Sequence, residues 1–341
     1  MFCSLGKLQG SLPPTNPAEW EAEFDRYKTF PEWKQRQSME IEEFKSIYFW
    51  EYSHRMLGRS VGVMFLLPFA FFSARKMIPR RLYGRLGMLF SLGGLQGAIG
   101  WWMVKSGLNN NDLQHRIEKN QEIRVSAYRL ATHLSMAFVT YGLLLWTGMD
   151  TVNPMKLKEY VQEKAASLTK EQVKKFVRVR QLALAQGGLV LATAISGAFV
   201  AGNDAGRAYN TFPKMGDGWL PPLDTLTELT PVYRNLFENT ATVQMDHRLL
   251  ALSTFTSIWA LYLPLKLSKS NLLNLKAFPR LTQVSLTALT HASLLQVGLG
   301  VATLLNYVPL GLAVAHQAGS VLVLTCSTIF IHSLKFIKYL K

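Results

Sequence analysis

Four of the seven histidines in this 341-residue sequence recur at matching places in two halves of the chain. His54 and His247 each lie at the start of an apolar stretch, and His133 and His316 each lie early in a later one. If the stretches are membrane-spanning helices, all four histidines lie toward one membrane face, and each half supplies a pair from two parallel helices. Two imidazoles that face each other across a helical bundle commonly hold a heme iron from both axial sides. The sequence therefore predicts two such sites. The plainer alternative is a histidine that only hydrogen-bonds to a neighbouring helix.

The residue beside the first histidine of each pair differs between the halves. Position 51 is glutamate, whereas its counterpart at position 244 is glutamine. Glu51 precedes His54 by three residues, so both side chains share one helix face. A carboxyl group beside a heme can move protons and a carboxamide cannot, which predicts chemistry in the first half and cofactor storage in the second. The alternative is that Glu51 is merely interfacial and solvated.

An arginine follows the first histidine of each pair, namely Arg55 and Arg248. A guanidinium at the membrane interface could bind a heme propionate through two hydrogen bonds. It could equally anchor a helix end by extending its charged head toward water.

These residues must be positioned by apolar blocks of the length that spans a bilayer as a helix. The seven blocks are residues 47–74, 84–104, 126–148, 181–202, 245–265, 281–305 and 310–334. The block 181–202 has no charged residue, whereas a soluble helix of that length would show a polar face. The sequence predicts an all-α integral membrane protein.

The halves carry the same marks in the same order, which indicates a duplicated bundle. The matching segments are 51–55 with 244–248, 95–100 with 295–300, and His133 with His316. The block 181–202 has no counterpart in the first half. We therefore expect two homologous four-helix bundles, with the first helix of the N-terminal bundle missing from this chain.

Four parts follow from this division. Residues 1–46 are expected to form an extramembrane leader with a short amphipathic helix near Ala18–Tyr27, and residues 47–150 an N-terminal half-bundle that carries the chemistry. Residues 151–180 are expected to be a charged linker, and residues 181–341 a C-terminal four-helix bundle.

The net charge of +15 is distributed as in a membrane protein rather than a nucleic-acid-binding protein. With alternating loops, one side carries 20 Lys/Arg against 4 Asp/Glu, and the other carries 15 against 17. The first side comprises residues 75–85, 150–180, 266–280 and the C-terminal tail, and the second comprises residues 1–46, 105–130 and 202–248. This asymmetry predicts an outer N-terminus, an inner C-terminus and no nucleic-acid partner.

The remaining cysteines and histidines predict no further site. Cys3 lies in the leader and Cys326 in the last apolar block, so a structural disulfide is not expected. His115 is expected to be solvated and His291 to hydrogen-bond to another helix. His332 lies at the inner end of the last block, away from the repeated histidines.

The sequence resembles the heme A synthases, a family of cytochrome oxidase assembly enzymes, over nearly the whole chain from about residue 7. The first-half motifs are Pro13-Pro14, Glu19-Trp-Glu-Ala-Glu-Phe24, Glu51-Tyr-Ser-His54-Arg55, Gly100-Trp-Trp-Met-Val-Lys-Ser-Gly107-Leu108 and Tyr128-Arg-Leu-Ala-Thr-His133. The second-half motifs are Ser196-Gly-Ala-Phe-Val-Ala-Gly202, Phe212-Pro-Lys-Met215, Asp246-His247-Arg248, Gln296-Val-Gly-Leu-Gly300 and His316-Gln317. The family's first span and the motif that follows it have no counterpart here.

The resemblance implies eight spans in two four-helix bundles and oxidation of the C8 methyl of heme O to a formyl group, giving heme A. It implies that Glu51 is the catalytic acid–base residue and that His54 and His133 hold the substrate heme. It also implies that His247 and His316 ligate a resident heme b.

The same resemblance implies partners and a location. The electron donor is expected to be a ferredoxin, and heme O synthase and a second copy of the chain are candidate partners. The location is expected to be the mitochondrial inner membrane or, alternatively, a bacterial plasma membrane.

Two other functions are compatible with paired histidines in a membrane bundle. One is a diheme b-type cytochrome that only transfers electrons, in which Glu51 has no special role. The other is a non-enzymatic heme carrier or assembly factor, which would release heme with its porphyrin unchanged.

Overall fold

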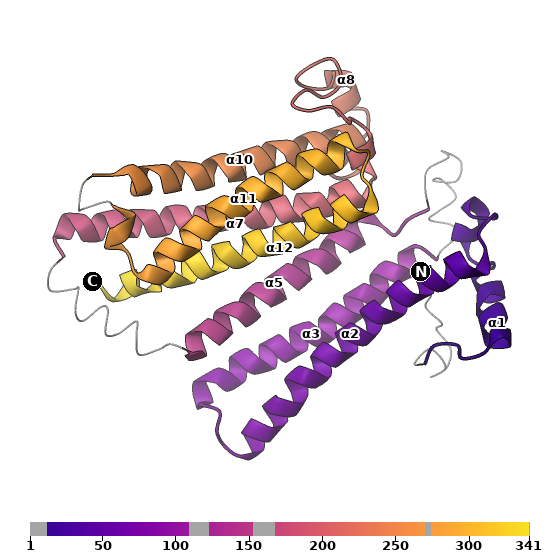
Figure 1. Cartoon of the computed structure of the whole chain (residues 1–341), viewed down its shortest axis with the longest axis horizontal. Coiled ribbons are helices and arrows are strands. Elements are labelled where there is room, and N and C mark those ends of the chain that lie inside the picture. The colour runs from indigo at the N-terminus through magenta and orange to yellow at the C-terminus, as the bar shows by residue number, and fades with distance from the viewer. Residues whose placement is uncertain (1–11, 109–122, 153–167, 270–273, 341) are drawn as a thin grey trace. The chain divides into compact units, whose positions relative to one another are not determined.

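The structure is a computed structural model that describes residues 12–108, 123–152, 168–269 and 274–340. These residues are mainly helical, and their one extended pairing is an isolated bridge between Met215 and Gly218. Seven long helices make up most of the described chain (Figure 1). They are α2 (Ile41–Ala74), α3 (Arg80–Ser106), α5 (Ala127–Val152), α7 (Lys170–Gly202), α10 (Thr240–Leu267), α11 (Arg280–Leu305) and α12 (Leu310–Ser333).

The predicted all-α membrane fold is confirmed. Among the described residues, six helices are long and apolar enough to cross a membrane. One expected span, 84–104, is not among these six. It lies within α3, which is 27 residues long but has a mean hydropathy too low for a spanning helix. Its glycines, Gln96 and the pair Trp101–Trp102 lower its mean hydropathy, because none of them contributes a large aliphatic side chain.

The first compact unit comprises residues 1–136. It contains the predicted leader helix as α1 (Pro17–Tyr27), which is capped by the Asn16 side chain accepting from the backbone N–H of Glu19 at 2.9 Å. A cluster of Tyr27, Met39, Phe44 and Tyr48 packs this leader against the start of α2.

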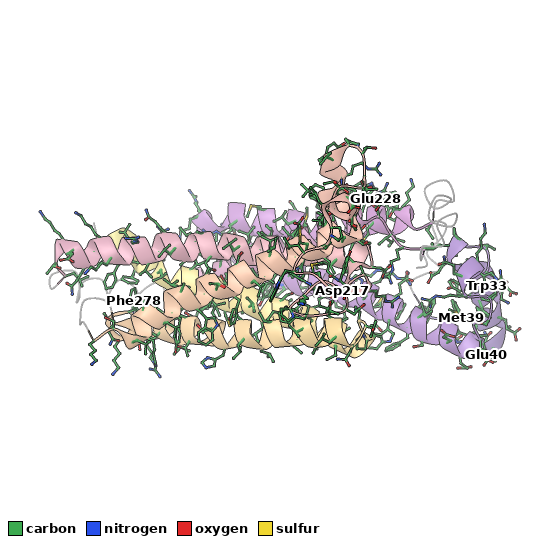
Figure 2. All side chains as sticks on the ribbon, turned by 90° about the horizontal axis from the view of Figure 1, so that it is seen from above. Trp33, Met39, Glu40, Asp217, Glu228 and Phe278 are labelled. Atoms are coloured by element: carbon green, nitrogen blue, oxygen red, sulfur yellow. The ribbon has the colours of Figure 1, made fainter. Side chains whose placement is uncertain are left out.

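Figure 2 shows Trp33 and Met39 near each other in the N-terminal part of the chain. Met39 is a member of this cluster, and Trp33 packs against it. Burial raises the pKa of the Tyr27 phenol to about 12. No residue of α2 beyond Tyr48 is buried, so the spanning part of α2 is largely exposed.

The second compact unit comprises residues 137–341. Helix α7 packs against α10, α10 against α11, α11 against α12, and α12 against α7, which closes a four-helix bundle. Its core includes Ile258, Leu286, Leu289 and Phe330, all fully buried. Helix α7, which contains the uncharged block 181–202, takes the fourth place in this bundle.

The division between the units falls inside α5, after Met136. The C-terminal part of α5 belongs to the second unit, where the Tyr141 hydroxyl and Thr325 Oγ1 of α12 form a 2.7 Å hydrogen bond. In the expected linker 151–180, residues 153–167 lie outside the described residues, and α7 begins at Lys170. The expected boundaries of the four parts stay a prediction.

Candidate functional site

The histidine pair of the second unit comes together between α10 and α12. The ring centroids of His247 and His316 are 6.5 Å apart, and the ring planes are at 90°. Because a metal–imidazole bond is about 2 Å long, two imidazoles that share one metal ion have centroids about 6 Å apart once the ring radii are added. The spacing of this pair therefore fits one ion held between two rings.

A hydrogen-bond relay from α7 sets the orientation and tautomer of His247. Ser196 Oγ lies 2.7 Å from His247 Nδ1 and also donates its proton to the Thr193 carbonyl at 2.8 Å. Since the hydroxyl proton is used for that carbonyl, Ser196 Oγ accepts from Nδ1–H. This leaves the Nε2 lone pair of His247 available as a ligand, which is how protein partners prepare metal-binding histidines.

The other histidine, His316, is held by α11. Gln296 Nε2 donates to the backbone carbonyl of His316 at 2.9 Å. A Cβ at Gly300 would lie 2.9 Å from His316 Cε1, and a Cβ at Gly319 would collide with the Gln296 side chain. Both glycines are thus needed for the close approach of α11 and α12 at this ligand. His316 Nδ1 and Gln296 Oε1 are buried and have no hydrogen-bond partner among the described residues.

The first unit repeats this arrangement around His133. Gln96 Nε2 of α3 donates to the backbone carbonyl of His133 at 3.0 Å, and a Cβ at Gly100 would lie 2.9 Å from His133 Cε1. His54 of α2 is exposed and close enough to His133 to interact with it electrostatically. The repeated glutamine and glycine were recognised in the sequence only as marks of duplication. In the structure they support the histidine on the following span.

The glutamate and glutamine that distinguish the halves occupy equivalent contacts. Glu51 Oε1 accepts from Arg55 Nη1 at 2.8 Å, and Gln244 Oε1 accepts from Arg248 Nη2 at 3.0 Å. In each pair the two residues are four positions apart, which is about one helical turn. The position is therefore built alike in both halves, and the substitution changes its proton chemistry more than its geometry.

The structure also gives a reason for glutamine at position 244. Gln244 is buried, and its Nε2 donates to the Ala205 carbonyl at 2.6 Å, so both ends of the amide are used. A carboxylate there would place an oxygen against that carbonyl. By contrast, the Glu51 side chain is 19% exposed, so its carboxylate is not sealed into a loop.

Arg248 has protein partners in the loop before α10. Its guanidinium donates to the carbonyls of Tyr209 at 2.8 Å, Thr211 at 2.9 Å and Lys214 at 3.1 Å. It thereby ties the Phe212–Met215 segment to the helix that carries His247. Propionate binding by Arg55 and Arg248 stays a prediction.

The three histidines without a repeat partner have different surroundings. His115 lies outside the described residues. The expectation for His291 is wrong in its partner, because Nδ1 donates to the Thr287 carbonyl of its own helix at 2.8 Å rather than to another helix. His332 Nε2 lies 2.8 Å from Asp150 Oδ1, which also forms an ion pair with Lys335.

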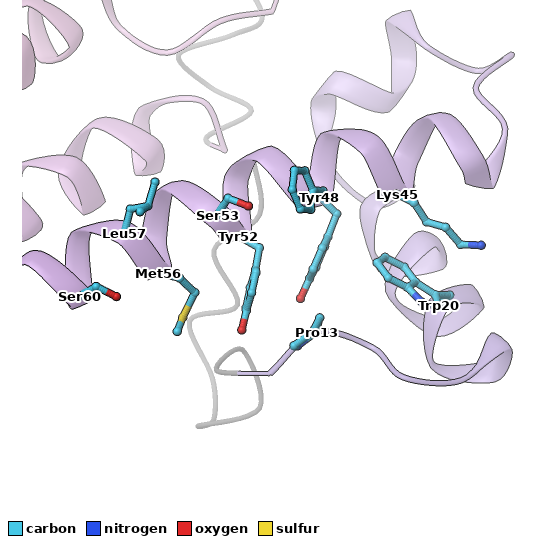
Figure 3. Close-up of a pocket in the computed structure, with 10 residues that line it drawn as sticks. Pro13, Trp20, Lys45, Tyr48, Tyr52, Ser53, Met56, Leu57 and Ser60 are labelled. Carbon is cyan, nitrogen blue, oxygen red and sulfur yellow. The ribbon is translucent and has the colours of Figure 1, made fainter.

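A groove of about 620 Å³ lies beside α2 in the first unit (Figure 3). Trp20, Tyr48, Tyr52 and Met56 contribute to its apolar lining. At 3.6 residues per turn, Tyr52 and Met56 lie on the opposite side of α2 from His54. These two side chains therefore face away from His54, whereas Leu57, three residues after His54, also lines the groove.

Comparison with known proteins places this arrangement in a family. Residues 6–328 match a family described as "Cytochrome oxidase assembly protein". The chain is 46% identical to heme A synthase COX15 of Arabidopsis thaliana over 96% of this chain and 67% of that protein. It is 44% identical to human heme A synthase COX15, over 92% of this chain and 70% of that protein. It is 39% identical to heme A synthase of Nitrosomonas eutropha, over 94% of this chain and 81% of that protein. The chain therefore belongs to the COX15-CtaA family of cytochrome oxidase assembly proteins.

Proposed function

We propose that this chain is a membrane-embedded heme A synthase that oxidises the C8 methyl of heme O to a formyl group. The observation that carries the proposal is the duplicated histidine support, with a carboxylate three residues before the first histidine in one half only, at Glu51 but not at Gln244. In both halves a glutamine and a glycine of one helix hold a histidine of the next, at Gln96, Gly100 and His133 and at Gln296, Gly300 and His316. The names of the relatives support the same activity.

The second half is assigned to a resident heme b. His247 and His316 would hold it, and the ring spacing of 6.5 Å together with the Ser196 hydrogen bond to Nδ1 supports this role. Such a heme supplies one-electron transfer when bound. The protein's part is to keep Nε2 of His247 unprotonated and both rings fixed. The electron donor is proposed to be a ferredoxin.

The first half is assigned to the substrate. His54 and His133 would hold heme O, and Glu51 would hold or deliver a proton on the same helix face as His54. Arg55 stabilises the Glu51 carboxylate through the 2.8 Å ion pair and fixes the oxygen that it contacts. Conversion of a methyl group to an aldehyde passes through the alcohol and then the hydrate of the aldehyde, which loses water, so protons must be moved at each stage.

Six apolar helices make the chain a multi-pass membrane protein, and relatives occur in eukaryotes and bacteria. The proposed location is the mitochondrial inner membrane or a bacterial plasma membrane. Heme O and heme A are the proposed substrate and product. Heme O synthase and a second copy of the chain are proposed neighbours in the membrane.

The test is extraction of heme from a host that makes heme O but lacks its own heme A synthase. We expect the chain to produce heme A, identified by mass, with some of the alcohol intermediate. If the chain were an electron-transfer cytochrome, the extract of the purified chain would contain heme b and no heme O or heme A. If it were a carrier, the extract would contain heme O unchanged. Either of those results would reject the enzymatic function.

A further inference from the structure

A groove of about 420 Å³ lies between the end of α10 and the start of α11, in the second unit. The end of α10 and the start of α11 lie at the opposite end of the bundle from α8 (Leu223–Leu226), as Figure 1 shows. Lys266 of the last turn of α10 and Arg280, the first residue of α11, both line the groove. Two cations from different helices therefore converge where two spans meet the membrane surface.

These two cations are unpaired within the part of the chain that the structure describes. Among the described residues, neither Lys266 nor Arg280 forms an ion pair or a side-chain hydrogen bond, and both are exposed. Gln283 adds a polar group, since only one of the two Nε2 hydrogens is used, for the Phe278 carbonyl at 2.8 Å. The rim of the groove can thus accept an anion without breaking an existing contact.

The rest of the lining is suited to a molecule that is part apolar. Leu275, Val284 and Ala288 contribute apolar walls. Thr287 and His291 continue the lining along α11 toward the middle of the membrane, and His291 is exposed there. These walls suit an acyl chain that runs inward from a headgroup at the two cations.

We propose that this groove binds an anionic phospholipid, with its phosphate at Lys266 and Arg280 and one acyl chain along Val284 and Ala288. Basic pockets between spanning helices on the positively charged side of a membrane protein are suited to such headgroups. The segments assigned to this side carry 20 Lys/Arg against 4 Asp/Glu, which favours an anionic over a zwitterionic lipid. The site is distinct from the histidine pair and does not depend on the proposed activity.

The test is native mass spectrometry of the full chain, titrated with dioleoyl phosphatidylglycerol or dioleoyl phosphatidylcholine. We expect tighter binding of the first phosphatidylglycerol. A basic residue near an anionic headgroup contributes about five-fold in affinity, so the double variant Lys266→Gln/Arg280→Gln should bind it about 25-fold more weakly. The matched control is Arg75→Gln/Arg80→Gln, which removes the same charge at the corresponding turn between α2 and α3.

A second variant leaves the charge unchanged. Ala288→Trp fills an exposed position in the groove and should also weaken lipid retention, with the melting temperature unaltered. Three results would overturn the proposal: equal affinity for both lipids, an equal loss in the control pair, or displacement of the lipid by millimolar inorganic phosphate. A lipid-independent dimer that Ala288→Trp dissociates would show instead that this face binds a second copy.

Discussion

Replacing Glu51 with glutamine removes an ionisable proton and alters little else. The second half shows what this change looks like, because Gln244 accepts from Arg248 at 3.0 Å where Glu51 accepts from Arg55 at 2.8 Å. The glutamine variant can therefore keep the contact to the arginine one turn later. A partly exposed ion pair of this kind is worth about 0.3–0.5 kcal/mol, so we expect the variant to fold normally.

The effect on the reaction should be much larger than the effect on stability. General acid–base assistance is typically worth about 10²–10⁴-fold in rate. We expect Glu51→Gln to lower the yield of heme A by a factor in that range, with heme O or the alcohol intermediate accumulating. The resident heme should be unaffected, because its proposed ligands His247 and His316 lie in the other unit.

The assay is extraction and mass analysis of heme, normalised to the amount of purified chain, together with the low-spin heme spectrum. The reciprocal variant Gln244→Glu is the control. It removes the amide donor to the Ala205 carbonyl in a buried setting and should cost about 1–3 kcal/mol of stability without creating a second active half. Normal heme A production by Glu51→Gln would refute the acid–base role of Glu51.

Three further changes test the support around the histidines and the leader. Ser196→Ala removes the acceptor of the Nδ1 proton of the α10 histidine, and a heme titration should show about 10–100-fold weaker binding; unchanged affinity would contradict this role. Gly300→Ala adds a methyl group 2.9 Å from a ring carbon of His316, so the melting temperature should fall and the low-spin spectrum should change. Gly298→Ala, with open space around its Cβ, should change neither. Burial raises the pKa of Tyr27 to about 12, so its contribution to stability is complete below about pH 10, the usual tyrosine value, and is lost as the pH rises toward 12. Tryptophan fluorescence of the leader should follow this loss, and Tyr27→Phe should abolish it.

The membrane helices could be predicted from the sequence because a helix that spans a bilayer needs about 20 apolar residues. Each of the seven apolar blocks lies in a long helix to within one residue at its ends, and the leader helix expected near Ala18–Tyr27 is α1. Residues 84–104 show the limit of this reasoning, since glycines and tryptophans can build a 27-residue helix with less apolar character than its neighbours. The division inside α5 could not be predicted, because it depends on which tertiary contacts each end of one helix makes.

The repeat predicted which histidines matter but not what holds them. The roles of Gln96 and Gln296 depend on a backbone carbonyl of the next span, which no local pattern reveals. Ser196 belongs to α7 and acts on a residue 51 positions later. Its only sequence signal is its place in a motif shared with the family. The position of His291 in the sequence likewise does not reveal that its side chain hydrogen-bonds to a carbonyl of its own helix.

The most direct test of the division of labour compares His54→Ala with His247→Ala. For each purified variant, the reduced-minus-oxidised spectrum reports resident heme b, and mass analysis of extracted heme reports conversion of heme O. We expect His247→Ala to lose the low-spin heme b signal and His54→Ala to keep it while heme O remains unconverted. Loss of heme b from His54→Ala, with its retention in His247→Ala, would contradict the assignment of chemistry to the first half and storage to the second.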